Sequence, residues 1–527
     1  MLVASAMLVG CGARQPRGAD TADLVLAGGS IFTGDPARPR VEAIAIRGDR
    51  VIAIGRSSEM PHATRTMDLR GRLVIPGIND AHVHEPSIIK YAVEVPGEFE
   101  TITLPLLLKA IEETTRKHAA GTWLHAELGR ELIDEAALTR QALDRVAPDH
   151  PVWIDNFAGH AVVLNSAALR ELALDPAGPP PRGGFIGHDA NGAADGWRYE
   201  YARYVALRRL GADVRDQDIA GAIGDFEDHA LAFGITSVQT LPTELEPARL
   251  MILLRAMGPK LRWHVMRLPV DELATPPRAV AVDPKAHVVF SGTKYFLDGT
   301  PIERGAALLA PYSDRATSGR MDWYRNAVRQ MLEAARASGD ALHVHVAGDR
   351  SVATVLDLMD EIGGDWRAQR VVLEHGDGLA KRDYARAKRL GVVVVQNPSH
   401  AMPAELMRAR IGNRVNDWMP MRSVLAAGIA FALGSDGPLN PFLNISFATK
   451  HPTNPGEALT REQALVAYTQ GAAFDERSET FKGKLVPGMV ADLAVLSQDI
   501  FTVPDAELPK TRSVMTIVGG KIMYDAR

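Results

Sequence analysis

The sequence contains a single cysteine, Cys11, among its 527 residues, so a disulfide within the chain is excluded. It has no long basic run and no stripe of basic and aromatic residues, and its formal net charge is only −5. Nucleic acid is therefore not expected as a partner. After the first residues, no apolar stretch is long enough to cross a bilayer. The hydrophobic share of 46% is that of an ordinary globular protein, and the length suits a large domain with a second module.

The cysteine ends a short apolar run at the start of the sequence. Leu8-Val9-Gly10-Cys11 is similar to a bacterial lipobox, in which the cysteine becomes lipidated. The run lacks the positive residues that usually begin a secretory signal, and a chance cysteine in an apolar start is the alternative. We expect residues 1–21 to be a lipoprotein-type signal and tether. The protein would then be extracytoplasmic, in the periplasm or cell envelope, and would contact the membrane only through a lipid anchor at Cys11.

Short strand signals occur near both ends of the sequence. Residues 22–75 include a hairpin signal at 43–55 with a Gly-Asp turn, and residues 484–527 include a hairpin that turns at Gly519-Gly520. Neither group of strands can bury both of its faces alone. We therefore predict one small β-sandwich domain built from residues 22–75 together with 484–527.

The residues between them, 76–483, alternate strand and helix signals. Strands are predicted at 151–154, 234–239, 341–346 and 392–396, among others, with amphipathic helices between them. Repeated units of this kind predict a parallel sheet, and their number favours a closed (β/α)8 barrel of the TIM type, inserted in the small β-sandwich. A stretch rich in proline and glycine at 178–184 predicts an insertion of about 178–200.

Residues that can bind metal recur where the predicted barrel strands end. His82 and His84 follow an apolar run at 74–75, and on a strand both would point to the same face. Each such residue alone has an ordinary explanation as a solvated histidine, a lysine that reaches the surface or an aspartate that caps a helix. In a barrel, however, the C-terminal ends of the strands meet at one site. That predicts one shared metal site for His82, His84, Lys294, His345, His375 and Asp436.

These motifs resemble the amidohydrolase superfamily, in the branch that includes N-substituted formamide deformylases. The resemblance rests on six segments: Pro76–His84, Gly292–Gly299, His345–Asp349, Leu373–His375, Gly434–Asp436 and Gly488–Leu496. It implies a binuclear metal centre, in which His82, His84 and Asp436 hold one divalent ion and His345 and His375 hold the other. It also implies that Lys294 bridges the two ions as a carbamate, that is, as a carbamylated lysine. Mixed imidazole and oxygen ligation favours zinc.

The resemblance further implies a hydrolase that cleaves a C–N bond of an amide, an N-acyl compound or a cyclic amide with a metal-activated hydroxide. Asp436 would be the catalytic group, first as general base and then as general acid. His160 would contact the small-molecule substrate, unless it only packs at a loop corner, and Glu374 would support a ligand. His343 shares a strand face with His345, so either histidine could be the ligand, although the Gly-Asp that follows favours His345.

Two other functions fit the same residues. An esterase or lactonase could use the same binuclear site, because the ligands do not distinguish esters from amides. A non-catalytic extracytoplasmic binding lipoprotein is an alternative of another class, although it would not need the full set of ligands. The predicted loops also carry arginines that either suggest a carboxylated substrate or are simply solvated: Arg304, Arg408, Arg410 and Arg414.

Overall fold

The computed structural model describes residues 21–87, 93–95, 102–129, 132–270, 273, 278–279, 283 and 285–527. The predicted lipobox and Cys11 lie outside these residues, so lipidation stays a prediction. Across the described residues, no helix combines the length and the apolar character that a membrane span requires.

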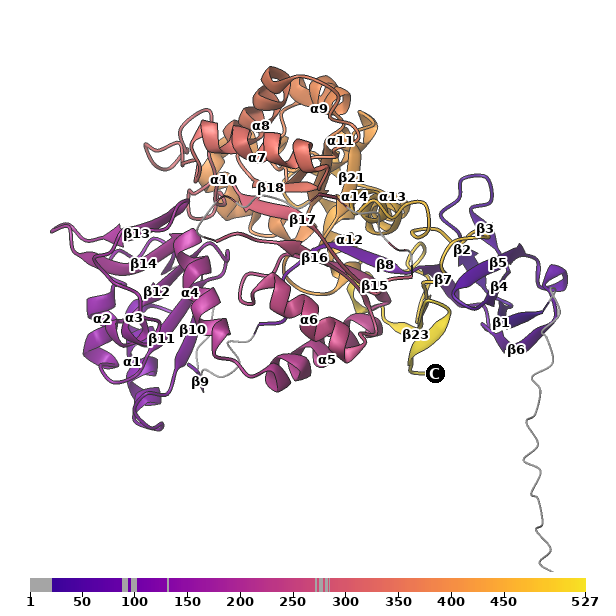
Figure 1. Ribbon diagram of the computed structural model, residues 1–527, viewed down its shortest axis with the longest axis horizontal. Helices are drawn as coiled ribbons and strands as arrows, with labels where there is room; N and C mark the ends of the chain where they lie inside the picture. Colours follow the sequence, from indigo (N-terminus) through magenta and orange to yellow (C-terminus); the bar gives the residue numbers. More distant parts are fainter. Residues whose placement is uncertain are drawn as a thin grey trace, which may run out of the picture.

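An eight-stranded parallel sheet forms the centre of the molecule (Figure 1). In sheet order its strands are β21 (Ala430–Leu433), β20 (Val393–Gln396), β19 (Val372–His375), β18 (Leu342–Val346), β17 (Val288–Phe296), β16 (Arg262–Arg267), β15 (Ile235–Thr240) and β8 (Ile78–Val83). The two edge strands meet at their C-terminal ends, where the Asp436 N–H donates to the His82 carbonyl at 2.9 Å. The predicted (β/α)8 barrel is thereby confirmed.

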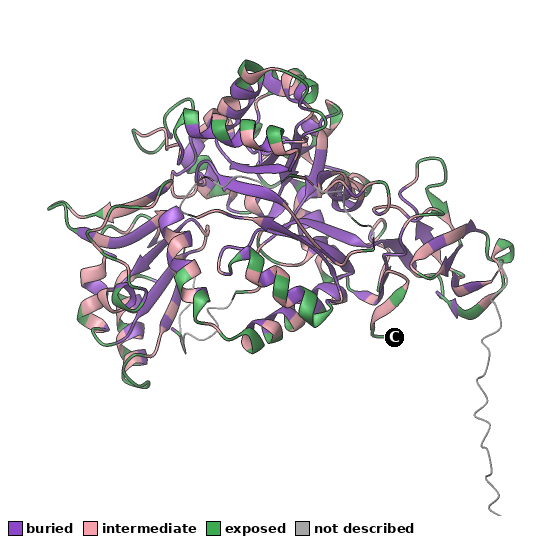
Figure 2. Cartoon of the chain, in the orientation of Figure 1, coloured by how far each residue is buried: buried purple, intermediate pink, exposed green. Residues whose placement is uncertain are grey.

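Helices cover the outside of the barrel, and Figure 2 shows buried strands surrounded by helices with exposed outer faces. In helix α7, buried residues such as Val328, Met331 and Leu332 recur at helical spacing and face the strands. The helix ends at Gly339, whose φ of 73° is the left-handed conformation that glycine adopts without strain. The helices from α4 onward are α4 (Tyr201–Ala212), α5 (Asp216–Ala232), α6 (Pro247–Met257), α7 (Arg325–Ser338), α8 (Asp349–Ile362), α9 (Tyr384–Leu390), α10 (Ala404–Ile411), α11 (Met421–Ala426), α12 (Pro441–Lys450), α13 (Arg461–Val466) and α14 (Ala472–Asp475).

Strands from both ends of the sequence form two further sheets beside the barrel. One has the order β5 (Arg50–Gly55), β4 (Ala43–Arg47), β1 (Ala22–Ala27) and β6 (Ala63–Asp68). The other has the order β24 (Lys521–Asp525), β23 (Ser513–Val518), β22 (Leu493–Leu496), β7 (Leu73–Pro76), β2 (Ser30–Phe32) and β3 (Arg40–Val41). The two sheets share a core in which Leu26 and Ile44 lie with Leu493 and Met515. Apolar faces from opposite ends of the sequence thus bury each other.

A six-stranded sheet on the other side of the barrel is larger than the predicted insertion. Its order is β13 (Gly184–His188), β14 (Ala194–Glu200), β12 (Ala161–Leu164), β11 (Val152–Asn156), β10 (Leu124–Leu128) and β9 (Val93–Glu94). With helices α1 (Leu104–Thr115) and α2 (Arg140–Val146) it encloses its own core, whereas the buried residues of α3 (Ser166–Glu171) pack into the main core. The segment 178–200 supplies only its last hairpin. The strand predicted at 151–154 forms, but it joins this sheet and not the barrel, because an apolar run does not specify which sheet it enters.

Candidate metal centre

A cavity of about 450 Å³ lies at the C-terminal ends of the barrel strands. Five of the six predicted metal ligands line it, together with His160. The sixth, Lys294, is fully buried. The structure therefore places the predicted residues at one location, although they lie on different strands: His82, His84, His345, His375 and Asp436.

Asp436 lies at the centre of this group. One of its carboxylate oxygens, Oδ1, is 3.2 Å from Nε2 of His84, and the other, Oδ2, is 3.5 Å from Nε2 of His82. Oδ2 is also 3.7 Å from Nε2 of His375. Burial raises the pKa of Asp436, but the charge of His82 and the hydrogen bond to His84 outweigh it and hold the pKa well below its usual range. The carboxylate is therefore ionised and faces imidazoles from both halves of the predicted centre.

His345 and His375, the residues predicted to form the second half of the centre, have ring centroids 4.2 Å apart. Lys294 lies close enough for its charge to lower the pKa of both histidines. Burial lowers the pKa of Lys294 itself from 10.5 to about 8. A lysine that loses its proton readily has the neutral amine that carbamate formation requires.

Two unusual backbone conformations aim these side chains into the barrel. His375 has a φ of 68° and Asp436 a φ of 38°, values that residues other than glycine seldom adopt. Successive residues of a regular strand point to opposite faces. The turn at His375 allows this histidine and its neighbour Glu374 to contact the same group of residues. Strain of this kind is typical of functional sites.

Glu374 connects two histidines beneath the centre. Its carboxylate oxygens accept hydrogen bonds from Nδ1 of His82 at 2.7 Å and from Nδ1 of His343 at 2.8 Å. Burial raises the pKa of Glu374, but the charges of Lys294 and His82 hold it well below its usual range. With Nδ1 of His82 occupied, its Nε2 is the atom that can bind a metal, which is the usual arrangement of a carboxylate behind a metal-bound histidine.

Among the described residues, several buried nitrogens of this group have no hydrogen-bond partner. They are Nζ of Lys294, both ring nitrogens of His345 and Nε2 of His375. Burial is the largest cause that holds the pKa of His345 and of His375 well below 6.5, so both imidazoles are neutral. Unpaired buried polar atoms are costly, whereas neutral imidazoles are metal ligands. The donor set therefore fits divalent metal ions.

The choice between His343 and His345 follows from the same contacts. His343 is fully buried beside Glu374 and does not line the cavity, whereas His345 lines it with both nitrogens unpaired among the described residues. The arrangement favours His345 as the ligand.

Several polar residues of the cavity were not predicted from the sequence, among them His400 and Asp377. His400 follows strand β20, and its Nε2 is 3.5 Å from Oδ2 of Asp436. Asp377 lies two positions after His375, and burial raises its pKa to about 8. The polar stretch after β20 was a usable signal for His400, because β20 is a barrel strand for which no ligand was predicted.

Three of the four arginines noted in the loops have partners within the protein. Nη2 of Arg304 donates to Asp314 at 2.8 Å, and Nη2 of Arg410 donates to Asp134 at 2.8 Å. Arg414 donates to three backbone carbonyls. These contacts connect the six-stranded sheet unit, which carries Asp134, to the barrel loops. They give no support to the interpretation that these three arginines bind a substrate carboxylate.

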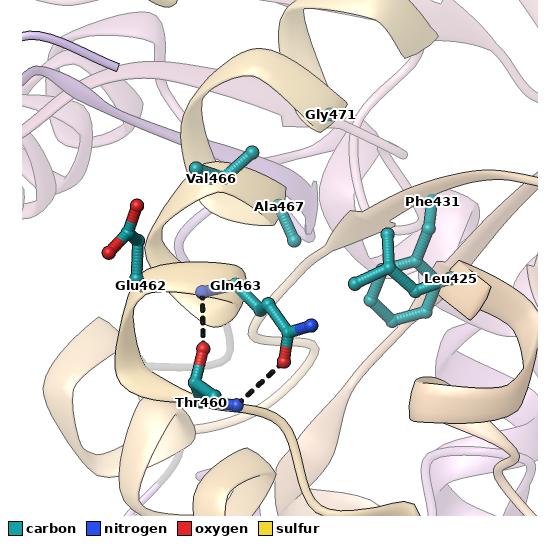
Figure 3. Close-up of a pocket in the computed structure, with 8 residues that line it drawn as sticks. All are labelled: Leu425, Phe431, Thr460, Glu462, Gln463, Val466, Ala467 and Gly471. Atoms are coloured by element: carbon teal, nitrogen blue, oxygen red, sulfur yellow. Dashed lines mark hydrogen bonds between the residues drawn. The ribbon is translucent and has the colours of Figure 1, made fainter. Parts of the chain in front are cut away.

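A second, smaller cavity of about 260 Å³ lies on the outside of the barrel, between β21 and α13 (Figure 3). None of the predicted ligands lines it. Its polar contacts belong to a helix cap, in which Thr460 and Gln463 exchange hydrogen bonds of 2.9 and 3.1 Å. This cavity therefore does not compete with the first as a catalytic site.

Three known proteins are similar to this chain over more than nine-tenths of its length. The chain is 26% identical to the N-substituted formamide deformylase of Arthrobacter pascens, over 95% of this chain and 98% of that protein. It is 25% identical to Protein LONG AFTER FAR-RED 3 of Arabidopsis thaliana, over 95% of this chain and 92% of that protein. In fold it is similar to an uncharacterized metal-dependent hydrolase from Pyrococcus horikoshii OT3, with a TM-score of 0.72, 22% identity and coverage of 92% of this chain and 99% of that one.

The model of the amidohydrolase family matches residues 65–524. This range includes the barrel, the histidines, Lys294 and Asp436. The predicted resemblance is confirmed, and the chain belongs to the amidohydrolase family.

Proposed function

We propose that this protein hydrolyses a C–N bond of an amide, an N-acyl compound or a cyclic amide at a binuclear metal centre. His82, His84 and Asp436 would hold one divalent ion, and His345 and His375 the other. Lys294, as a carbamate, would bridge them. Zinc is the proposed metal, since the ligands are mostly imidazoles.

One observation carries this proposal: buried, unpaired nitrogens of Lys294, His345 and His375 lie beside the carboxylate of Asp436. A protein that only binds ligands gains nothing from this costly arrangement. The family match supports hydrolysis, and the relative from Arthrobacter pascens is named for cleaving N-substituted formamides.

When bound, the metal ions would supply Lewis acidity and allow water to react as a nucleophile near neutral pH. The residues of the chain would do the rest. Asp436 would take the proton from the attacking water and deliver it to the leaving nitrogen. Glu374 would keep His82 oriented through their 2.7 Å hydrogen bond. His160, which lies beside His345 in the wall of the cavity, would contact the substrate.

The walls of the cavity suggest what the substrate carries on its nitrogen or acyl side. Beyond the polar residues, the lining includes apolar side chains from several loops: Phe157, Ile302, Met402, Met407 and Met419. An apolar substituent would remove water from this surface, which favours binding. We propose that the substrate is a small amide that carries an apolar group.

Removal of the metal tests the function. Purified protein would be stripped with a chelator, assayed against a panel of N-substituted formamides, N-acyl amines and cyclic amides, and then reloaded with zinc. Hydrolysis should disappear on stripping and return on reloading, with metal content measured at each step. A hydrolysis rate that survives complete stripping would contradict the proposal.

The same panel should contain matched esters and lactones. A higher kcat/KM on an ester than on the amide of the same acyl group would instead favour the esterase or lactonase alternative. Binding of panel compounds without any turnover would favour the binding protein.

The predicted lipid anchor is a separate proposal. We propose that Cys11 is lipidated and that the protein is extracytoplasmic. Mass spectrometry of the mature N-terminus from the native host tests this, and an unmodified Cys11 would contradict it.

A further inference from the structure

A buried carboxylate pairs with His160 at the wall of the cavity. His160 comes from the six-stranded sheet unit, just before β12, and its ring centroid lies 4.7 Å from that of His345. Its Nδ1 is 2.8 Å from Oε2 of Glu200, the last residue of β14. The side chains of His160 and Glu200 are 8% and 1% exposed. The pair is therefore shielded from water but adjacent to the metal centre.

The backbone holds this pair in register. The N–H of Glu200 donates to the carbonyl of His160 at 2.9 Å, so the two residues are joined through both main chain and side chain. Glu200 adopts φ 51° and ψ −126° at the junction between β14 and α4. This conformation is rare for a residue with a side chain and is typical of positions where strain serves a function. It presents the carboxylate to the histidine.

A glycine of the lysine motif makes room for the same carboxylate. A Cβ at Gly299 would lie 2.5 Å from Oε1 of Glu200 and 3.0 Å from Oε1 of Glu303. Gly299 does not have a positive φ, so its backbone does not demand glycine, and space is the reason for the residue. The segment Gly292–Gly299, which carries Lys294, thus leaves space for the carboxylate of Glu200.

We propose that Glu200 is a positioning residue of the reaction. Its carboxylate accepts a hydrogen bond from the Nδ1–H of His160 and so fixes the orientation of the ring. The other ring nitrogen, Nε2, can then form a hydrogen bond to the bound substrate. The six-stranded sheet would in this way contribute directly to the barrel site. The inference rests on the proposed function and extends it from His160 to Glu200 and Gly299.

The same sheet offers a matched control. Nδ1 of His125 is 2.8 Å from Oε2 of Glu94, which repeats the distance of the first pair at an exposed carboxylate. Neither residue lines the cavity. Glu94→Gln therefore makes the same chemical change as Glu200→Gln at a place where no substrate binds. Gly221→Ala is the control for Gly299→Ala, because a Cβ at Gly221 meets nothing within 4 Å.

The experiment measures kcat, KM and metal content of the zinc-loaded full-length variants. Glu200→Gln should lower kcat about a hundredfold with metal content unchanged. Gly299→Ala should lower it about tenfold, because displacing a supporting carboxylate commonly costs this much. Glu94→Gln and Gly221→Ala should stay within about twofold. A kcat of Glu200→Gln within twofold of wild type, with the metal retained, would overturn the proposal.

A second readout does not depend on activity. The hydrogen-bonded Nδ1–H of His160 should give a downfield proton signal in protein labelled with ¹⁵N-histidine, assigned by its loss in His160→Gln. Glu200→Gln should shift or remove this signal, and Glu94→Gln should leave it unchanged. A signal insensitive to Glu200→Gln would overturn the pairing. If the wild type hydrolysed no amide but the signal responded as expected, the proposed function would fail while the pairing would stand.

Discussion

The two ends of the barrel use buried charged residues in opposite ways. At the C-terminal end, Lys294 is fully buried and its Nζ has no hydrogen-bond partner among the described residues. At the N-terminal end, Lys482 is also buried, but it forms an ion pair with Glu476 and donates to Ser237 at 2.9 Å. Both lysines incur a cost of burial, and of the two only Lys482 has direct hydrogen-bonded partners among the described residues.

The N-terminal end also joins the barrel to the sheets built from the chain ends. Nε of Arg262, at the start of β16, donates to Asp492 at 2.7 Å, and the other oxygen of Asp492 accepts from the Gly519 N–H at 2.6 Å. Charged groups at this end form ion pairs that join separate elements, whereas at the C-terminal end Nζ of Lys294 has no hydrogen-bond partner among the described residues. The contrast separates residues kept for stability from residues kept for chemistry, and mutations at the two ends should affect different measurements.

The largest effect is expected for Asp436→Asn. The amide has the shape of the carboxylate and can still coordinate, but it cannot carry the proton. We expect most of the zinc to be retained and kcat to fall about a thousandfold, measured alongside metal content. Asp505→Asn is the control, because Asp505 pairs with Arg461 far out on the surface, and it should leave kcat within about twofold. A kcat near wild type in Asp436→Asn would mean that another group moves the proton.

The two buried lysines provide the sharpest comparison. Lys294→Met should lose at least half of the metal and lower kcat about a hundredfold, because the amine proposed to bridge the two ions is removed. Partial rescue by a short carboxylate such as acetate is expected. Lys482→Met should keep its metal but lose about 3 kcal/mol of unfolding free energy, because Glu476 is left without its partner. Metal analysis and denaturant unfolding in chelator measure both effects. Equal metal loss in the two variants would remove the distinction between the two ends.

The barrel was predictable because its strand and helix signals alternate in order along the sequence. The residues at the strand ends were predictable for the same reason, since the fold brings the ends of parallel strands together. The six-stranded sheet was not, because β11 pairs with β10 and β12 through contacts that an apolar pattern does not encode.

The role of Glu200 also had no signal in the sequence. Its contact with His160 depends on a strained backbone at a strand–helix junction and on the space left by Gly299. The backbone conformation of Glu200 and the space beside Gly299 can be recognised only once both segments have been located in the fold. Similarly, the arginines of the loops gave no sign of their partners, because Asp134 lies in a different structural unit from Arg410.

A smaller effect is expected where the barrel meets the end sheets. Asp492→Ala would remove the carboxylate that forms an ion pair with the buried guanidinium of Arg262, so we expect a loss of about 3 kcal/mol in unfolding free energy. kcat and metal content per folded molecule should not change. Thermal unfolding and steady-state kinetics check this, and a loss of turnover without a loss of stability would place a functional role at this end as well.

The smallest effect is the pH dependence of Glu476. Burial raises the pKa of Glu476, but the charges of Lys482 and His264 outweigh it and lower the pKa below 4.5. A carboxyl group with a depressed pKa stabilises the folded state above its unfolded pKa, and this stabilisation is lost as the pH falls through the folded value.

At pH 7, Glu476→Gln should cost about 1 to 3 kcal/mol of unfolding free energy, measured in chelator so that metal loss does not contribute. The difference from wild type should shrink as the pH is lowered below 4.5. Glu507→Gln, at an exposed pair with Lys510, should change stability by less than about 0.5 kcal/mol at either pH. A difference for Glu476→Gln that stayed constant down to acidic pH would show that hydrogen bonding alone, and not charge, stabilises this end of the barrel.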